Sequence, residues 1–363
     1  MAILVALVLG TVGWSYGRAL TRPGELGPAV RTVEWVRGHG GGGLVALAEG
    51  WWYGKHPPPV GGAPPPGAIP PPPPPRPVAM AGPHLPPPPP VPPIVTPALP
   101  GEGRWHPVGP RVMGAPAVYE AFLRPDPVHT SLVTGVAWMD PKLLRARLFA
   151  GLYQPGDGPW AHQAPMPPRL RPGLVAAFNS GFKLSDAHGG YYADGRTAKA
   201  LVPGAASLVI HKNGTATVGA WGTQVRMGPQ VAAVRQNLTL IVDHGHRVPG
   251  LAAGPATKWG ATVANKALVW RSGVGVTARG ALVYAAGRGL SVSSLAAVLS
   301  HAGAVRAMEL DINSVWTSFF SFDRPLGRPA SAANGHKLLA TMLRPPSRYL
   351  GPAERDFVAM FAR

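Results

Sequence analysis

Cysteine is absent from this chain of 363 residues, so disulfides and metal sites built from thiolates are excluded. A chain without cysteine suits either side of a membrane, and the redox compartment is therefore left open. Lysine is scarce, with 8 residues against 26 arginines, and only 16 residues are acidic. The sequence also lacks a Gly-rich phosphate loop, a G-x-S-x-G elbow and an H-E-x-x-H pair, which removes support for nucleoside-triphosphate, esterase and zincin chemistry.

The excess of positive charge, +18 overall, is spread along the chain. Residues 1–118 carry 8 basic and 4 acidic side chains, and residues 119–363 carry 26 and 12. No run of like charges and no nucleic-acid recognition motif accompanies the excess, so we predict no nucleic-acid partner. A diffuse positive field instead favours anionic surfaces, such as phospholipid headgroups or phosphate-bearing wall polymers.

The N-terminal apolar run, Ala2 to Tyr16, contains no charged residue. It is shorter than the ~20 residues that a spanning helix needs, and it lacks the basic start and small-residue cleavage site of a signal peptide. The run is either a signal anchor or a buried hydrophobic helix. Because no globular sequence follows closely to bury it, we predict that residues 1–22 form a hydrophobic membrane anchor and that the chain is extracytoplasmic.

Residues 23–56 contain two short amphipathic pieces separated by glycines at positions 40–43. We predict a juxtamembrane amphipathic segment, since aromatic side chains gather where a helix meets the headgroup layer. A helical hairpin that packs on itself explains the pattern equally well. The aromatic residues concerned are Trp35, Trp51, Trp52 and Tyr53.

Proline dominates the next segment, where 26 of the 46 prolines lie between Pro57 and Pro116. Such sequence adopts extended polyproline II without a packed core, so we predict that residues 57–118 form a disordered linker. Fully extended, its roughly 60 residues would reach about 190 Å at ~3.1 Å per residue. The simplest interpretation is a spacer that carries a functional head. The alternative is a wall-spanning scaffold in which the Pro-rich arm is the working part.

Residues 119–363 are long enough to bury one core, and they show short β-like runs separated by Gly, Asn and Asp. We expect a single α+β domain, rich in strands, with a mixed or antiparallel sheet and few helices. The clearest helix is Ser291 to Ala302, which begins with serines and ends before Gly303. Asn213-Gly214 predicts a two-residue hairpin turn with positive φ at both positions. The expected strands are 132–139, 143–152, 174–178, 206–211, 215–221, 237–243, 267–270, 273–277, 281–286, 305–311 and 315–322.

Two polar clusters follow apolar strands. In the first, Asn179 and Ser180 offer hydrogen bonds to sugar hydroxyls or phosphate oxygens, and Gly181 allows a ligand close to the backbone. A plain Asn-Ser-Gly turn is the alternative. In the second, Arg271 follows a short strand, where its guanidinium would serve as an ion-pair partner or as a bidentate phosphate ligand.

A run of glycines, tyrosines and an Asp/Arg pair spans residues 189–197. Tyr191 and Tyr192 suit stacking on a sugar ring, and Asp194 and Arg196 would lie in a loop that closes over it. A β-turn at Asp194 with a solvated arginine is the alternative, and on sequence alone it explains the run better.

Glu309, Asp311 and Asn313 alternate along the chain, so we expect them on one face of a strand that leads to Trp316. Three polar groups beside an apolar run are hard to explain as core, although a solvated strand face would also show this pattern. Glycosidases use pairs of carboxylates near the scissile bond, and this face could supply one or both. The histidines show no metal-ligand spacing, so no cofactor is expected, and a divalent metal is left open.

In their order along the chain these clusters resemble the phosphodiester glycosidase family, which includes the lysosomal "uncovering" enzyme. The similarity begins at about Val133 and rests on FNSGFK, WRSGVGVT and MELDINS, which match the family's N-G-G-F, R-[ST]-x-x-G and L-D-G-G-x-S elements. The run from residue 189 to 222 also looks like that of secreted actinobacterial members. The chain departs from the family where Ser180 replaces a glycine and where Ile312-Asn313 replaces two glycines after the aspartate.

The resemblance implies hydrolysis of a sugar C1–O–phosphate bond in an extracytoplasmic phosphoglycan or other glycosyl-phosphate, and it places Asn179, Arg271 and Asp311 in the active site. We predict that Asp311 acts as base or nucleophile, with Glu309 or Asp194 as the second carboxylate. The alternative is a non-catalytic module that binds phosphate-bearing wall glycans. The expected substrate contacts are Asn179, Ser180, Tyr191, Tyr192, Arg196, Arg271, Asn313 and Trp316.

Overall fold

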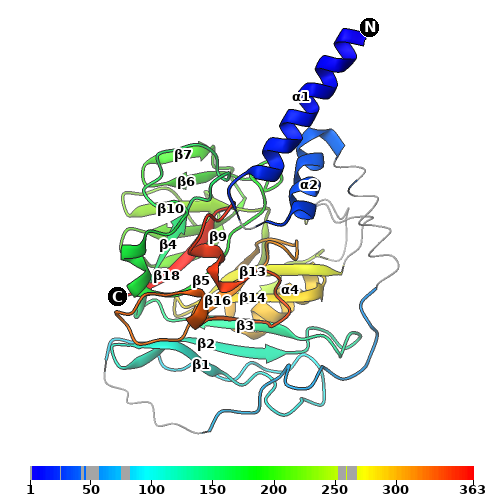
Figure 1. Cartoon of the computed structure of the whole chain (residues 1–363). Helices are drawn as coiled ribbons and strands as arrows, with labels where there is room; N and C mark the ends of the chain where they lie inside the picture. The colour runs from blue at the N-terminus through cyan, green and yellow to red at the C-terminus, as the bar shows by residue number, and fades with distance from the viewer. Residues whose placement is uncertain are drawn as a thin grey trace.

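A computed structural model describes residues 2–24, 26–41, 45, 57–74, 82–251, 259 and 268–363 (Figure 1). In this part of the chain the strands form three antiparallel sheets and helices are few, as expected for a strand-rich α+β domain. Side chains from all three sheets meet in one buried cluster, which includes Val274, Phe178 and Leu208. The predicted fold class is therefore confirmed for the domain.

The largest sheet has eight strands. Its register places Gly273 opposite Glu309, the last residue of the neighbouring strand. Across the sheet the strands are β1 (His106–Val112), β2 (Ala115–Leu123), β3 (Thr134–Met139), β14 (Leu282–Leu290), β13 (Val269–Thr277), β15 (Ala304–Glu309), β11 (Leu240–Asp243) and β12 (His246–Arg247).

Two five-stranded sheets complete the domain. The first runs in the order β7 (Arg196–Lys199), β6 (Tyr191–Ala193), β10 (Val231–Gln236), β8 (Ala206–His211) and β9 (Ala216–Ala220). The second runs in the order β17 (Gly335–Lys337), β16 (Phe319–Phe322), β5 (Leu174–Asn179), β18 (Phe357–Ala362) and β4 (Leu144–Phe149).

The predicted helix at 291–302 is confirmed as α4 (Val292–His301). Ser291 caps it with a capping box, in which its hydroxyl accepts from the Ser294 backbone and the Ser294 hydroxyl accepts from the Ser291 backbone. Gly303 follows the helix with φ +89°, the left-handed conformation that commonly ends a helix. On the sheet side, a Cβ on Gly273 would lie 2.9 Å from Leu299, so this glycine lets α4 pack closely on β13.

The turn between β8 and β9 corrects the predicted two-residue hairpin. Gly214 has φ +82°, but Asn213 is not in the left-handed region. The backbone N–H of Gly214 donates to His211, and that of His211 donates to Thr215, so the connection is longer than two residues. Its single left-handed glycine is typical of a three-residue hairpin loop.

The predicted strands locate most of the sheet, with errors at their ends. Runs 267–270 and 273–277 belong to one strand, β13, with residue 267 outside the described residues. The strand expected at 305–311 ends at Glu309, and the one expected at 315–322 begins only at Phe319. The strands that were not predicted are β1, β2, β6, β7, β10, β12, β17 and β18.

The boundary predicted between linker and domain is wrong, because ordered structure begins before residue 119. Strand β1 and the first four residues of β2 lie within the segment 57–118, and Leu85, Val91 and Val95 are buried. Glu102 forms a buried ion pair of 2.8 Å with Arg124. The prolines do not prevent this, because an extended chain can lie on a folded surface and supply apolar rings to it.

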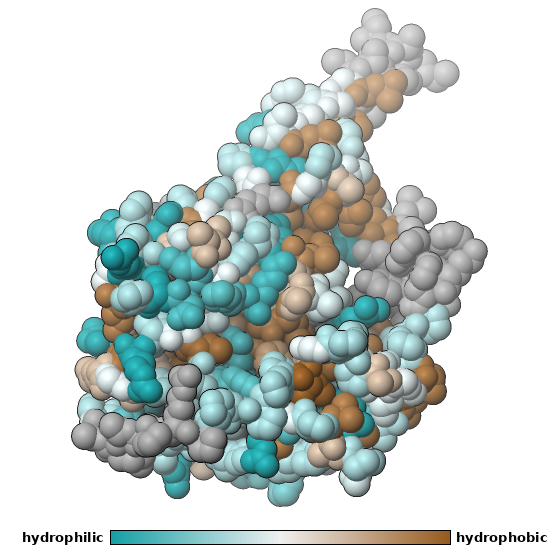
Figure 2. Space-filling model, turned by 60° about the horizontal axis from the view of Figure 1, so that its bottom comes forward, coloured by the Kyte–Doolittle hydropathy of each residue, from teal (hydrophilic) through white to brown (hydrophobic). Residues whose placement is uncertain are grey.

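The N-terminal residues form a helical arm, α1 (Ala2–Thr21) followed by α2 (Pro28–Val36) and a turn at Arg37–Gly41, which projects from the domain (Figures 1 and 2). The helices pack on each other through Tyr16 and Trp35, whose rings lie 5.1 Å apart. Among the described helices, none is both long and apolar enough to cross a membrane. The membrane anchor predicted for residues 1–22 therefore gains no support, and Trp51, Trp52 and Tyr53 lie outside the described residues. Within the residues that the structure describes, further short helical turns occupy Pro168–Gly173, Ala332–Asn334 and Pro346–Tyr349.

Candidate active site

Asn179, at the end of β5, is the centre of a buried polar network. Its Nδ2 donates to Ser272 Oγ at 3.0 Å and to the carbonyl of Ser180 at 2.9 Å. Its Oδ1 accepts from Tyr284 Oη at 2.8 Å and from the backbone N–H of Ser318 at 3.0 Å. Both donor and both acceptor positions of the amide are thus occupied by the protein, so Asn179 joins strands β5, β13, β14 and the segment before β16.

Arg271 and Glu309 form an ion pair inside the largest sheet. Arg271 is 3% exposed and Glu309 is fully buried, and Arg271 Nη1 donates directly to Glu309 Oε1. Arg271 also donates to the carbonyls of Leu290 and Trp259. Burial raises the pKa of Glu309, although the adjacent guanidinium opposes the rise. Arg271, which the sequence suggested as a phosphate ligand, is occupied by other partners in this arrangement.

Asp311 and Asn313 do not share a strand face with Glu309, which corrects the sequence interpretation. Strand β15 ends at Glu309, and the next residues turn. Asp311 Oδ1 accepts from the backbone N–H of Asn313 at 2.9 Å, and Asn313 Oδ1 accepts from that of Val315 at 2.9 Å. These are side-chain-to-backbone bonds two residues ahead, which compete with strand pairing and favour turns.

The second carboxylate oxygen of Asp311 points to Arg355, which immediately precedes the C-terminal strand region. Arg355 Nη1 donates to Asp311 Oδ2 at 2.8 Å. Asp311 is 2% exposed, and burial raises its pKa above the usual value while Arg355 opposes the rise. Ser272 accepts from the Asp311 backbone at 3.2 Å and donates to its carbonyl at 2.9 Å, which fixes the position of the carboxylate.

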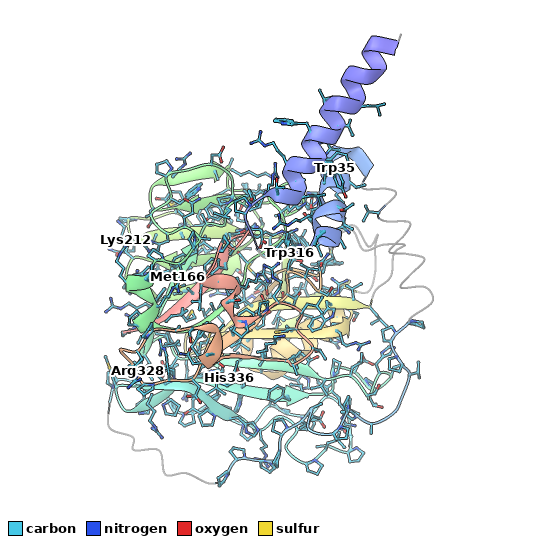
Figure 3. All side chains as sticks on the ribbon, in the orientation of Figure 1. Trp35, Met166, Lys212, Trp316, Arg328 and His336 are labelled. Carbon is cyan, nitrogen blue, oxygen red and sulfur yellow. The ribbon has the colours of Figure 1, made fainter. Side chains whose placement is uncertain are left out.

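A pocket of about 350 Å³ lies between this part of the domain and the helical arm. Trp316 is the one predicted site residue that lines it, and Trp35 of α2 lines it from the arm; Figure 3 shows both. Three guanidinium carbons surround the Trp316 ring, at 4.0 Å for Arg355, 5.3 Å for Arg348 and 6.0 Å for Arg344. The domain side of the pocket is formed by Tyr153, Gln154, Lys183, Trp316, Glu354 and Arg355.

Glu34 of α2 extends from the arm into this pocket. Its Oε2 pairs with Lys183 Nζ, and its Oε1 lies 3.7 Å from Arg355 Nη2. The arm is also fixed by backbone contacts, since the N–H of Leu26 donates to Glu354 at 3.2 Å and Tyr153 Oη donates to the Pro23 carbonyl at 2.8 Å.

The residues predicted around position 194 are not part of this pocket. Tyr191 is fully buried and contacts Trp160, with ring centroids 5.3 Å apart. The Arg196 guanidinium lies over the same Trp160 ring, 4.9 Å from its centroid. Asp194 has φ +48° in an exposed turn between β6 and β7, and Tyr192 packs in a separate apolar cluster. The turn interpretation of this run is the one that agrees with the structure.

Several functional candidates were not singled out from the sequence. Asn237 accepts from the backbone N–H of Phe182 and donates to the carbonyl of Glu309, so it ties the loop after β5 to the end of β15. Lys183 belongs to the FNSGFK motif, but the sequence gives no sign that it lines the pocket and pairs with Glu34. Ser180, by contrast, is 2% exposed, and its hydroxyl has no hydrogen-bond partner among the described residues. Over the same residues, no group of three or more acidic or histidine side chains could hold a metal ion.

Comparisons with known proteins find distant structural likeness only. No family model matches the chain, and no curated protein matches it. The zebrafish N-acetylglucosamine-1-phosphodiester alpha-N-acetylglucosaminidase catalytic domain, auto-inhibited by its pro-peptide, is 15% identical with a TM-score of 0.44, over 70% of this chain and 86% of that one. A hypothetical protein from Synechocystis is 14% identical with a TM-score of 0.38, over 70% and 64%. A Burkholderia pseudomallei protein described as exported is 14% identical with a TM-score of 0.35, over 65% and 75%.

Proposed function

We propose that the chain hydrolyses the C1–O–phosphate bond of a glycosyl-phosphate diester in an extracytoplasmic glycan. The observation that carries the proposal is the contact between the buried Asp311 carboxylate and Arg355. Arg355 and Lys183 are cations that line the pocket. Hydrolysis of such a bond needs a carboxylate near the sugar carbon and positive charge near the departing phosphate. Asp311 is proposed as that carboxylate, and Arg355 and Lys183 as that positive charge.

Asp311 supplies the carboxylate. It attacks C1 directly and forms a glycosyl ester that water then hydrolyses at C1, or it takes the proton from a water molecule that attacks C1. The departing phosphodiester group keeps the electron pair of the C1–O bond as a phosphate monoester anion. Because that anion is stable without immediate protonation, a strong general acid is needed less than in an ordinary glycoside.

Four of the other predicted residues, Asn179, Arg271, Glu309 and Trp316, support the site from behind. The Arg271–Glu309 pair holds the end of β15, and Asn179 holds β5 beside it. Trp316 provides the surface on which Arg355 rests. In this arrangement Arg355 and Lys183, instead of Arg271 and Arg196, meet the phosphate.

The proposed substrate is a phosphoglycan outside the cytoplasm. The net charge of +18 supports this choice, because a diffuse positive field raises the local concentration of a phosphate-bearing polymer. It supports no nucleic-acid role without a recognition motif.

One observation favours a second candidate, a module that binds phosphate-bearing wall glycans without turnover. Of the predicted site residues, Trp316 alone lines the pocket, and the Glu309 carboxylate is paired with Arg271. Such a module would be retained on purified wall polymer, would release no sugar and would tolerate Asp311→Asn.

The test is release of reducing sugar from a panel of synthetic glycosyl-1-phosphate diesters by the full chain. Because Glu34 lies in the pocket, Glu34→Gln is assayed beside the wild type. We expect Asp311→Asn to lower the rate at least about 100-fold, within the usual range for a lost catalytic acid or base. Asp157→Asn, a change at an exposed carboxylate, serves as the control and should keep the full rate. No release by any active-site-intact form, or equal release after Asp311→Asn, would sink the proposal.

A further inference from the structure

Glu34 is bound by two domain cations through different oxygens. Oε2 pairs with Lys183, and Oε1 lies 3.7 Å from Arg355 Nη2 and 3.7 Å from Nη1 of Arg37, the residue that directly follows α2. Burial by itself would raise the pKa of the Glu34 carboxyl, but the charges of Arg355, Lys183 and Arg37 outweigh it and hold the pKa below its usual value. The carboxylate is thus an anion, and it lies where the domain presents positive charge.

The domain carboxylates of this region pair with one edge of Arg355 and leave its other edge and Lys183 to Glu34. Asp311 accepts from Nη1 of Arg355, and Nη2 of the same guanidinium faces Glu34. Glu354 accepts from Arg344 at 3.1 Å and from the Leu26 backbone, so it does not neutralise Lys183. In the described part of the chain, the Lys183 ammonium forms its ion pair with Glu34.

We propose that Lys183 and Arg355 form an anion subsite for the substrate phosphate, and that Glu34 occupies this subsite as an internal substitute. This assignment rests on the proposed function, which supplies the phosphodiester. A phosphodiester group has two non-bridging oxygens that share one negative charge, as the two oxygens of a carboxylate do. One oxygen would meet the Lys183 ammonium and the other the Arg355 guanidinium, two groups that commonly bind phosphate.

The subsite is also held in place for this task. The Trp316 ring lies 4.0 Å from the Arg355 guanidinium carbon. Asp311 binds Nη1 of that guanidinium, while Nη2 faces Glu34. Lys183, with a side chain 26% exposed, lies at the open side of the pocket. A phosphate can therefore replace Glu34 without rearranging the buried part of the site.

Replacement of one anion by another makes the arm a competitor for the substrate. When a ligand binds only the open form, its apparent affinity falls in proportion to the population of that form. The arm must move for the phosphate to enter. Its other contacts with the domain, among the described residues, include Leu26 to Glu354, Pro23 to Tyr153 and the Arg22 guanidinium over the Tyr153 ring. Removal of the Glu34 charge should consequently favour phosphate.

The test is titration calorimetry of the full-length chain with inorganic phosphate, which reads binding without turnover. We expect Glu34→Gln to bind phosphate at least about tenfold more tightly than the wild type, because the internal competitor loses its charge. In the Glu34→Gln background, Lys183→Met should weaken phosphate binding by at least about tenfold, as expected for one charge-assisted contact.

Matched controls use exposed residues outside the pocket. Asp157→Asn is the control for Glu34→Gln, and Lys212→Met, at a position labelled in Figure 3, is the control for Lys183→Met. Both should leave phosphate affinity unchanged. Acetate is titrated in parallel, and it should bind Glu34→Gln more weakly than phosphate does.

Three results would overturn the assignment. Equal phosphate affinity in the wild type and Glu34→Gln, including no binding to either, would refute occupation by Glu34. Unchanged affinity after Lys183→Met would remove Lys183 from the subsite. Acetate affinity equal to that of phosphate would show a general carboxylate site. If the expected phosphate pattern appears in a chain that releases no sugar, the hydrolysis fails and the anion subsite stands.

Discussion

Asp311 and Arg355, 44 residues apart in the chain, are joined by a hydrogen bond of 2.8 Å from Arg355 Nη1 to Asp311 Oδ2. Arg355 Nη2 faces the Glu34 carboxylate across the pocket. One guanidinium therefore connects a buried carboxylate to the place where an anion is held. This connection links the proposed chemistry of Asp311 to the charge of the pocket.

The pH dependence of turnover should report this contact. Asp311 acts only when ionised, and burial raises its pKa above the usual 3.8 while Arg355 opposes the rise. The value of kcat/KM should thus fall as pH decreases through a midpoint above 3.8, the pKa of an unperturbed aspartate. Arg355→Met should move that midpoint upward by about one pH unit, since it removes the opposing charge. Arg328→Met, a change at an exposed arginine, is the control and should leave the midpoint in place. An unchanged midpoint in Arg355→Met would contradict this account.

Asn179 should matter for stability more than for substrate affinity. Its amide makes four hydrogen bonds to the protein, including those to Ser272 and Tyr284. Asn179→Ala leaves those buried partners unpaired and should lower the free energy of unfolding by about 1–3 kcal/mol. Denaturant titration measures this change, and a double-mutant cycle with Tyr284→Phe should show coupling. An unchanged unfolding midpoint with a raised KM would instead favour direct contact between Asn179 and the substrate.

Glu120 should make stability depend on pH. Burial raises its pKa from 4.5 to about 7, while a hydrogen bond from Ser321 opposes the rise. A carboxyl whose pKa is raised by folding stabilises the native state most below pH 4.5, and the contribution disappears as pH increases to about 7. Relative to Glu120→Gln, the wild type should lose up to about 3 kcal/mol across this window. Denaturation curves at several pH values measure the difference, and parallel curves for the two proteins would refute the burial effect.

The sequence predicts the regular parts of the domain well. Residues 206–211 form β8 at the predicted bounds, and the serine cap and following glycine locate α4. Strand β1 was missed because its prolines argue against a strand; it lies at the edge of its sheet, where proline is tolerated. Strand β18 is buried along its length and has no alternation to reveal it.

The site was less predictable, because its contacts join distant segments. FNSGFK and MELDINS do lie together, through Asn179, Ser272 and the Asp311 backbone. No local pattern, however, pairs Lys183 with Arg355 or brings Glu34 to both. The turn at Asp311 also follows from side-chain bonds to the backbone, which the alternation of polar residues cannot distinguish from a strand face.

Truncation should show that the domain begins within the Pro-rich segment. A chain that starts at residue 119 loses β1 and cuts β2, which spans Ala115–Leu123 and pairs with β3. It also loses Glu102, the buried partner of Arg124, which is expected to cost about 3–5 kcal/mol when one partner is removed. We expect fragment 119–363 to lack a cooperative unfolding transition and fragment 82–363 to keep one. Cooperative unfolding of the shorter fragment would restore the boundary predicted from the sequence.

Hydrolysis in ¹⁸O-labelled water shows most directly which bond of the diester is broken. The full chain, as wild type and as Glu34→Gln, is given a glycosyl-1-phosphate diester, and the products are analysed by mass spectrometry. Attack at C1, by Asp311 or by a water that it activates, predicts that the label enters the anomeric oxygen of the released sugar and that the phosphate stays unlabelled. Label in the phosphate would mean cleavage of the P–O bond and would contradict the glycosidase mechanism.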